Sequence, residues 1–403
     1  MFLYNSMWAW NLPASTAPHG VVLHAVGCPL ENAESRQAPT SRDRFILFDP
    51  DSYLWELDSE TCGRAVKCLE SYPWIPTMVE RTALPSMTDE QVAAILGAAA
   101  DWQKTRGVSR IILPTPLISE SDQSVDEFLR WLDTAISVAA GLSPQSLIAV
   151  GVSEVAIRRH FDTILDHLTA RRELPGIYIF AETSRSSGSV AVNQDVARML
   201  LMASHFVGQR LGREVVVNFA DTFGLACLAV GAAAFAGGYE RKCRRLNFEN
   251  FEERDGGGAF PKFFALGTTA YYRPEKDLQR IRDARLLRLL EGDRTASSAA
   301  LFEALKAGGS ARDVPTWRES RNNVAAAKAH LIERLCGATD ELVALRPGPD
   351  RIAWVLEWLQ NAELNVTYLG TRFEDAPLDD DGRHVRAWRA SFESFIDEFE
   401  LVV

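Results

Sequence analysis

Residues 177–182 read IYIFAE, residues 214–221 read EVVVNFAD, and residues 235–240 read FAGGYE. Each stretch is a short apolar segment that ends in an acidic residue, and longer segments with helical periodicity lie between them. Parallel strands joined by helical crossovers close into barrels whose loops after the strands gather at one face. The pattern therefore predicts a barrel with polar side chains at the carboxyl ends of its strands.

The same alternation of apolar and amphipathic segments extends from about residue 20 to residue 270. Helices are predicted at residues 88–103, 124–140, 154–171 and 193–212. Further strands are expected at residues 21–27, 45–48, 75–80, 108–113, 147–152 and 263–266. With the three segments quoted above, the predicted strands number about nine, whereas a (β/α)8 barrel needs eight. We therefore expect the first or second strand to belong to a lid or a hairpin.

The composition changes after residue 275, where charged helical segments replace the alternation of strands and helices. We predict a TIM-like (β/α)8 barrel over residues 1–275 and a mostly helical C-terminal extension over residues 276–403. The extension carries several tryptophans, which argues against a disordered tail. Its helices are expected at residues 275–290, 297–307, 322–336, 350–363 and 385–399.

Composition restricts the classes of partner and the cellular compartment. The net charge of −11 makes the whole chain a poor nonspecific binder of nucleic acid or of anionic membranes. No run of about 18 apolar residues is present, so no membrane partner is expected. The six cysteines include no CxxC pair and no cluster with histidine at the spacing of metal ligands. These features predict a cytoplasmic protein with reduced thiols and no bound cofactor or metal.

Asp221 and Glu182 are the candidate catalytic residues, because each follows a strongly predicted strand. Asp221 could act as a nucleophile or base, or it could cap the alanine-rich helix that follows. Asn218, at the same strand end, is a candidate substrate-binding residue. Glu182 opens the hydroxyl-rich stretch ETSRSSG, in which Arg185 suits an anionic ligand. The alternative for this stretch is a solvated loop that caps a helix.

The basic stretch RKCRR at residues 241–245 stands out in an acidic chain. Arg241, Lys242 and Arg244 are candidate phosphate ligands, because the loop near the seventh strand of such barrels commonly binds phosphate. A solvated loop that pairs with nearby acids is the alternative. Glu80, after the expected strand at residues 75–80, is a further candidate for substrate binding.

Paired carboxylates at strand ends fit chemistry on a glycosidic bond. One carboxylate attacks or stabilises a cationic sugar while the other transfers a proton. Asp49 and Asp51 follow the strand expected at residues 45–48 and could add to this set. Because acidic strand ends are common in barrels, the pattern does not by itself identify the reaction.

Two segments resemble the tRNA-guanine transglycosylase superfamily. Residues 224–231, GLACLAVG, are similar to the glycine-rich stretch that contacts the base, and residues 263–268, FFALGT, are similar to the strand after it. The resemblance implies a barrel that exchanges a base through an aspartate nucleophile, here Asp221. The zinc site of that superfamily, which consists of three cysteines and a histidine, is absent from this sequence.

Three functions are consistent with these observations. The first is a transglycosylase-like enzyme that acts on an N-glycosidic bond of a nucleoside or nucleic acid. The second is an inactive barrel that binds a protein partner through its helical C-terminal part. The third is a metal-dependent hydrolase in which acidic residues hold Mg²⁺ or Mn²⁺; its ligands would be Glu80, Glu182, Asp221 and Glu240.

Overall fold

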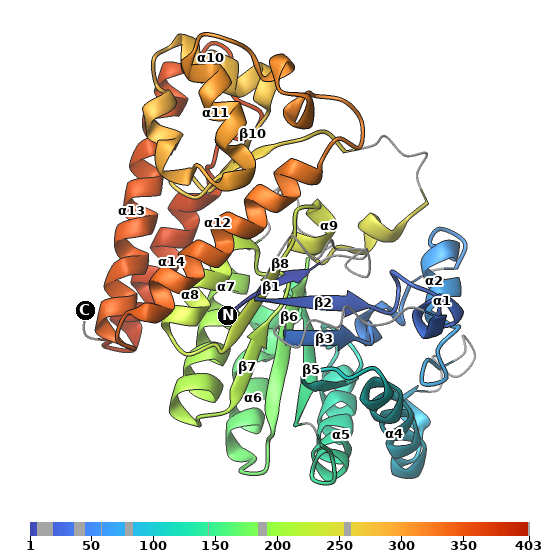
Figure 1. Ribbon diagram of the computed structural model, residues 1–403. Coiled ribbons are helices and arrows are strands. Elements are labelled where there is room, and N and C mark those ends of the chain that lie inside the picture. The colour runs from blue at the N-terminus through green and yellow to red at the C-terminus, as the bar shows by residue number, and fades with distance from the viewer. Residues whose placement is uncertain are drawn as a thin grey trace. The chain divides into compact units, whose positions relative to one another are not determined.

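The computed structural model describes most of the chain as two compact units (Figure 1). The first unit comprises the described residues up to Glu253, and the second comprises those from Ala259 onward. The described residues are 1–5, 19–35, 45–57, 59–76, 84–143, 145–183, 192–253 and 259–401.

The first unit is built on eight parallel strands in the order β3-β2-β1-β8-β7-β6-β5-β4. This order is sequential around a ring, because β1 pairs with both β2 and β8. Between the two end strands, the amide of Ser109 donates to the carbonyl of Ile46 at 2.7 Å. The sheet is thus nearly closed. The strands are β1 (Phe2–Asn5), β2 (Gly20–His24), β3 (Phe45–Asp49), β4 (Ile111–Leu113), β5 (Ser146–Ser153), β6 (Gly176–Glu182), β7 (Glu214–Val217) and β8 (Ala234–Gly237).

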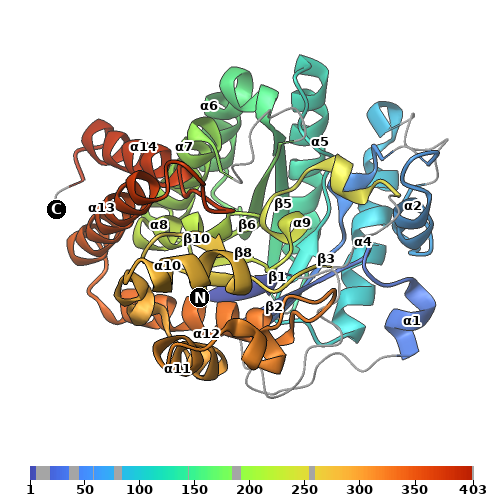
Figure 2. The same ribbon diagram turned by 90° about the horizontal axis from the view of Figure 1, so that it is seen from above.

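Helices alternate with these strands and lie around the outside of the sheet (Figure 2). The predicted TIM-like barrel is therefore confirmed. Thr88 caps α4 through a reciprocal pair of hydrogen bonds with Gln91, and Ser121 and Asn193 cap α5 and α7. The helices are α1 (Leu30–Ser35), α2 (Gly63–Leu69), α4 (Asp89–Thr105), α5 (Asp122–Ala139), α6 (Glu154–Ala170), α7 (Gln194–Ala203), α8 (Gly224–Ala229) and α9 (Arg241–Arg244).

The predicted strands and helices differ from the structure at several places. The segment Phe2–Asn5, which was not predicted as a strand, is β1, and β2 is a barrel strand and not part of a lid or a hairpin. The helix expected at residues 193–212 changes after Ala203 into a π-helical turn, Ser204–Arg210. Of the strand expected at residues 75–80, only Ile75 and Pro76 are among the described residues, and neither lies in a strand.

The alanine-rich run at residues 223–237 forms a short helix followed by a strand. Helix α8 ends at Ala229, and β8 begins five residues later at Ala234. Gly224 allows α8 to pack directly on β8, since a Cβ at this position would lie 2.2 Å from the ring of Phe235. The helix is short because the chain must return within a few residues to pair β8 with β1 and β7.

The second unit is mostly helical, as predicted for the C-terminal extension. Its hairpin joins β9 (Phe263–Ala265) to β10 (Ala270–Tyr272) in antiparallel pairing, so the prediction of a barrel strand at residues 263–266 was wrong. A three-residue apolar strand has too little pattern to distinguish these two pairings. The helices are α10 (Gln279–Asp283), α11 (Ala299–Lys306), α12 (Ala325–Ala344), α13 (Pro349–Arg372) and α14 (His384–Glu398).

The helix expected at residues 275–290 is broken into three short pieces. A π-helical turn, Pro274–Leu278, precedes α10, and a 3-10 helix, Leu287–Asp293, follows it. Arg285, with a φ of 60°, separates α10 from that 3-10 helix. Within the described parts of both units, none of the helices is long and apolar enough to cross a bilayer.

Candidate functional site

Seven polar side chains converge at the carboxyl ends of the barrel strands, and we call this group the deep cluster. They come from the last residues of β1, β2 and β3, from the turn that follows β3, from β6, and from the segment after β7. Each is exposed to 2% or less, so the cluster forms part of the packed interior. Buried polar groups are tolerated where they are hydrogen-bonded to one another. The members are Asn5, His24, Asp49, Asp51, Tyr53, Tyr178 and Asn218.

His24 faces a hydrogen-bond acceptor at each ring nitrogen. Its Nδ1 lies 2.7 Å from Oδ1 of Asp51, and its Nε2 contacts Oδ1 of Asn5. The Asn5 amide cannot be turned around, because its Nδ2 donates to Oδ1 of Asn218 at 2.7 Å and to the Cys243 carbonyl at 3.2 Å. Both ring nitrogens of His24 therefore carry a proton. Burial lowers the pKa of His24, but the charges of Asp51 and Asp49 outweigh burial and raise that pKa overall.

Asp51 and Asp49 receive different sets of hydrogen bonds. Asp51 accepts from Tyr53 Oη at 2.7 Å, from the Val26 amide at 2.8 Å and from His24. Asp49 accepts from Tyr178 Oη and from the Asp51 amide, both at 2.8 Å. Burial and the charge of Asp51 raise the pKa of Asp49 to about 7. The cluster thus places a carboxyl group that can hold a proton at neutral pH beside an imidazolium–carboxylate pair.

His24, Asp49 and Asp51 also have the composition of a metal site, because ligand atoms of all three lie within 4.8 Å of one another. Binding a cation through His24 would require one ring nitrogen to lose its proton. It would also break the hydrogen bond of that nitrogen with Asp51 or Asn5. The hydrogen-bond pattern therefore fits a proton-holding network better than a set of metal ligands.

The deep cluster also fixes the turn after β7. Oδ1 of Asn218 accepts from the Phe219 amide at 2.7 Å and from Asn5, while Nδ2 of Asn218 donates to Tyr178. Phe219 and Asp221 have φ values of 53° and 47°, a left-handed conformation that is unfavourable for residues with a side chain. The hydrogen bonds of Asn218 hold this strained turn, and the turn carries Asp221.

Asp221 lies at the edge of the interior, with 12% of its side chain exposed. Its Oδ1 accepts from the Thr222 amide at 2.9 Å, and its Oδ2 lies 3.7 Å from Nη1 of Arg244. Asp221 begins a 3-10 turn, whereas the residue at the N-cap of α8 is Phe223. The side chain of Asp221 is therefore not placed to cap α8, which was the alternative to a functional role.

Glu182 is the last residue of β6 and is buried. Partial desolvation of its carboxyl group and the negative charge of Glu182 raise the pKa of Glu56, an exposed residue shortly after β3. Arg245, also buried, interacts electrostatically with Glu182 and donates from Nε to Oγ1 of Thr183 at 2.7 Å. The structure therefore brings Glu182, Glu56 and Arg245 together on one side of the barrel end.

The basic stretch at residues 241–245 does not present all its charges on one face. Arg245 is buried, Arg244 lies beside Asp221, and Nζ of Lys242 lies 3.9 Å from Oε2 of Glu240. Lys242 is also near enough to His24 for its charge to lower the pKa of that histidine. Arg241, the first residue of α9, is exposed. Arg241 is thus the most accessible phosphate ligand of the predicted set.

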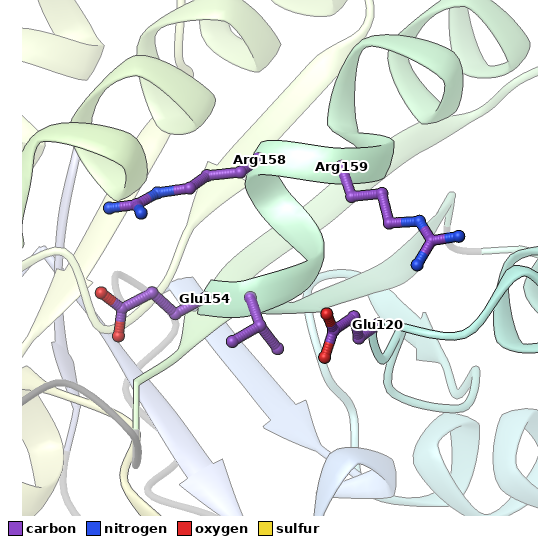
Figure 3. A pocket seen from close by; sticks show the side chains of 5 residues that line it. Glu120, Glu154, Arg158 and Arg159 are labelled. Carbon is purple, nitrogen blue, oxygen red and sulfur yellow. The ribbon is translucent and has the colours of Figure 1, made fainter.

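A cavity of about 430 Å³ opens at the first turn of α6 (Figure 3). Glu154 and Glu120 flank that turn, and the side chains of Arg158 and Arg159 extend to opposite sides. Oε1 of Glu154 accepts from Asn193, whereas Oε2 is buried without a hydrogen-bond partner among the described residues. Burial raises the pKa of Glu154. Glu154, which lines the cavity, therefore has one buried carboxyl oxygen without a hydrogen-bond partner among the described residues.

Sequence reasoning identified part of this site. Asp221, Asn218, Glu182, Arg241, Lys242 and Arg244 all lie near the carboxyl ends of the strands, whereas Glu80 and Arg185 lie outside the described residues. Asn5, His24, Tyr53 and Tyr178 were not among the predicted site residues. The signal that could have found Asn5 and His24 is a polar residue at the last position of an otherwise apolar strand.

Comparisons of this chain with models of known protein families, with curated proteins and with solved structures find no match.

Proposed function

We propose that this chain is an enzyme that cleaves or exchanges an N-glycosidic bond of a nucleoside or nucleic acid at the carboxyl end of its barrel. The observation that carries this proposal is the position of Asp221, a partly exposed carboxylate on a strained turn that a buried hydrogen-bond network holds in place. Strained residues of this kind cluster at functional sites. The transglycosylase-like resemblance of residues 224–231 favours the same reaction.

Asp221 would attack the anomeric carbon or stabilise the oxocarbenium ion that forms as the base leaves. Such a reaction needs a carboxylate whose position is fixed before the substrate arrives. The Thr222 amide and the Arg244 guanidinium orient the two carboxylate oxygens of Asp221. Asn218 acts as a positioning residue in this account, because its amide group is engaged by Asn5, Tyr178 and its own turn.

The leaving base needs a proton, and the pair Glu182 and Glu56 is suited to supply it. Two neighbouring carboxyl groups do not ionise independently, so one of them retains a proton to higher pH. The raised pKa of Glu56, caused by partial desolvation and by the charge of Glu182, fits this arrangement. Glu56 would hold the proton, and Glu182 would pass it to the leaving base as the acid/base partner. Arg241, Lys242 and Arg244 would contact substrate phosphate.

The cellular location and the partners are part of the same proposal. All six cysteines are present as thiols in the structure, which suits a reducing cytoplasm. A nucleic acid or nucleobase would be the ligand of the barrel, and a protein partner could bind the helical C-terminal part. No cofactor takes part in the reaction as we write it.

Release of free base tests the proposal directly. The protein would be incubated with single nucleosides, a short tRNA and a DNA duplex, and released base would be quantified by chromatography, with incorporation of labelled base as a second readout. We expect release from at least one substrate and a loss of at least about 100-fold in Asp221→Asn. Asp101→Asn is the matched control, because Asp101 is 77% exposed on α4. Absence of release from every substrate, or full activity of Asp221→Asn, would overturn the proposal.

A further inference from the structure

The second unit contains a cavity of about 310 Å³ that the barrel chemistry does not use. It lies between the β9–β10 loop, the 3-10 helix Leu287–Asp293, α12 and α13. Asp293, Arg334, Trp354, Glu357 and Trp358 are among the residues that line it. The volume is at the lower end of the range for small-molecule sites.

The guanidinium of Arg334 is fixed in this cavity by a buried carboxylate. Its Nε donates to Oδ1 of Asp293 at 2.9 Å, and Oδ2 of Asp293 accepts from the Gly267 amide at 3.0 Å. Asp293 is itself buried. Such a pair holds the guanidinium in one orientation, which reduces the conformational entropy that ligand binding costs.

Most of the donors of Arg334 are not used within the protein. The side chain is only 16% exposed, yet within the described part of the chain its Nη atoms make no hydrogen bond. Its Nη1 lies 3.8 Å from Oε1 of Glu341, beyond hydrogen-bond distance. A guanidinium has five N–H donors arranged for bidentate binding of carboxylate or phosphate. The Nη donors of Arg334 are therefore available to a carboxylate or phosphate group.

Two tryptophans on α13 form an aromatic wall of the same cavity. The ring centroids of Trp354 and Trp358 are 6.1 Å apart. Trp358 is buried and donates its indole N–H to the Leu266 carbonyl at 3.0 Å, whereas Trp354 is only partly buried. The partly buried ring of Trp354 offers a surface on which a planar group can stack.

We propose that this cavity binds a small planar anion, with its ring on Trp354 and its carboxylate or phosphate on Arg334. Asp293 and Glu357 place two carboxylates beside the one guanidinium. This charge balance disfavours a polyanion such as a nucleic-acid backbone. Recognition of a single anionic group therefore depends on the directed N–H donors of Arg334 and not on the net charge of the cavity. The inference rests on the second unit alone and is independent of the reaction proposed for the barrel.

Isothermal titration with four probes tests the two parts of the ligand separately. AMP carries a base and a phosphate, adenosine lacks the phosphate, ribose 5-phosphate lacks the base, and benzoate replaces the phosphate by a carboxylate. We expect AMP or benzoate to bind at least tenfold more tightly than adenosine and ribose 5-phosphate, and the tighter of the two identifies the anionic group. Adenosine binding as tightly as AMP, or no binding of AMP or benzoate, would overturn the proposal.

Three variants locate the binding in this cavity. Gly292→Leu should abolish binding of the tighter probe by filling the cavity; a Cβ at Gly292 meets no heavy atom within 4 Å, so the fold should tolerate the change. Arg334→Gln should weaken binding at least tenfold. Arg346→Gln is the matched control, because Arg346 is 74% exposed and outside the cavity. Unchanged binding by Gly292→Leu would refute the site even if Arg334→Gln folds poorly.

Discussion

Replacing Asp49 by asparagine should change how the stability of the barrel depends on pH. The pKa of Asp49 is raised from 3.8 to about 7, first by burial and then by the charge of Asp51. Between pH 3.8 and about pH 7, residue 49 holds a proton more often in the folded chain than in the unfolded chain. Unfolding free energy therefore falls as pH rises through this window. The difference between the two pKa values corresponds to about 4 kcal/mol over the whole window.

The comparison between wild type and Asp49→Asn tests this contribution. Asparagine cannot lose a proton, so the variant lacks the part of the pH dependence that comes from residue 49. Between pH 5 and pH 8 we expect wild type to lose about 3 kcal/mol relative to the variant. The raised pKa of His24 also makes stability fall with rising pH. Because the charge of Asp49 contributes to that raised pKa, the variant loses part of the His24 contribution as well, which changes the difference in the same direction.

Hydrogen exchange measured by mass spectrometry at pH 5, 6, 7 and 8 is the suitable assay. After correction for intrinsic exchange rates, peptides from β5 and β6 report the opening of the barrel without the second unit. Asp101→Asn should follow wild type at every pH, because that carboxylate is exposed. Identical pH dependence in wild type and Asp49→Asn would refute the reasoning, because it would mean that Asp49 ionises in the folded protein as it does in the unfolded one.

Three other predictions concern packing, capping and a second buried titratable group. Gly224→Ala should lower the unfolding free energy by about 3 kcal/mol, because the new Cβ would lie 2.2 Å from the ring of Phe235. Gly97→Ala is the control and should not destabilise the protein, because a Cβ at that position meets nothing within 4 Å. Equal effects of the two substitutions in urea unfolding would contradict this account. Thr88→Ala should cost about 1 kcal/mol through loss of the α4 cap, and an unchanged urea midpoint would contradict the cap. Burial lowers the pKa of His330 from 6.5 to about 4. Since the folded second unit then binds fewer protons than its unfolded form, it should lose about 3 kcal/mol as pH falls from 6.5 to 4, and His330→Gln should remove that loss in a urea–pH series.

The parts of the fold that the sequence predicted are those with long, regular patterns. The helices expected at residues 88–103, 124–140 and 154–171 match α4, α5 and α6 closely, because each repeats apolar residues over several turns and follows a capping or acidic residue. Short elements carry too little pattern for this. Phe2–Asn5 has four residues and was not predicted to be a strand, and the three residues of β9 were assigned to the wrong sheet.

The candidate site was predictable only where one residue and its strand carry the signal. Asp221 and Glu182 follow strong strands, so their place at the barrel end could be inferred. The deep cluster depends on pairs that are far apart in the sequence: His24 and Asp51 are 27 residues apart, and Asn5 and Asn218 are 213 apart. No local pattern encodes these pairs, because each becomes a neighbour only when the barrel closes.

The central claim is that Asp221 takes part directly in cleavage of the N-glycosidic bond. The most direct test is a single-turnover measurement of base release by wild type and Asp221→Asn, with enzyme in excess over the nucleoside or nucleic acid from which base release is detected. Acid quenching gives the rate of bond cleavage itself, separated from product release. The account predicts a fast phase in wild type that slows by at least about 100-fold in Asp221→Asn, while hydrogen exchange shows that the barrel remains folded. Equal cleavage rates in the two proteins would contradict the role that we give to Asp221.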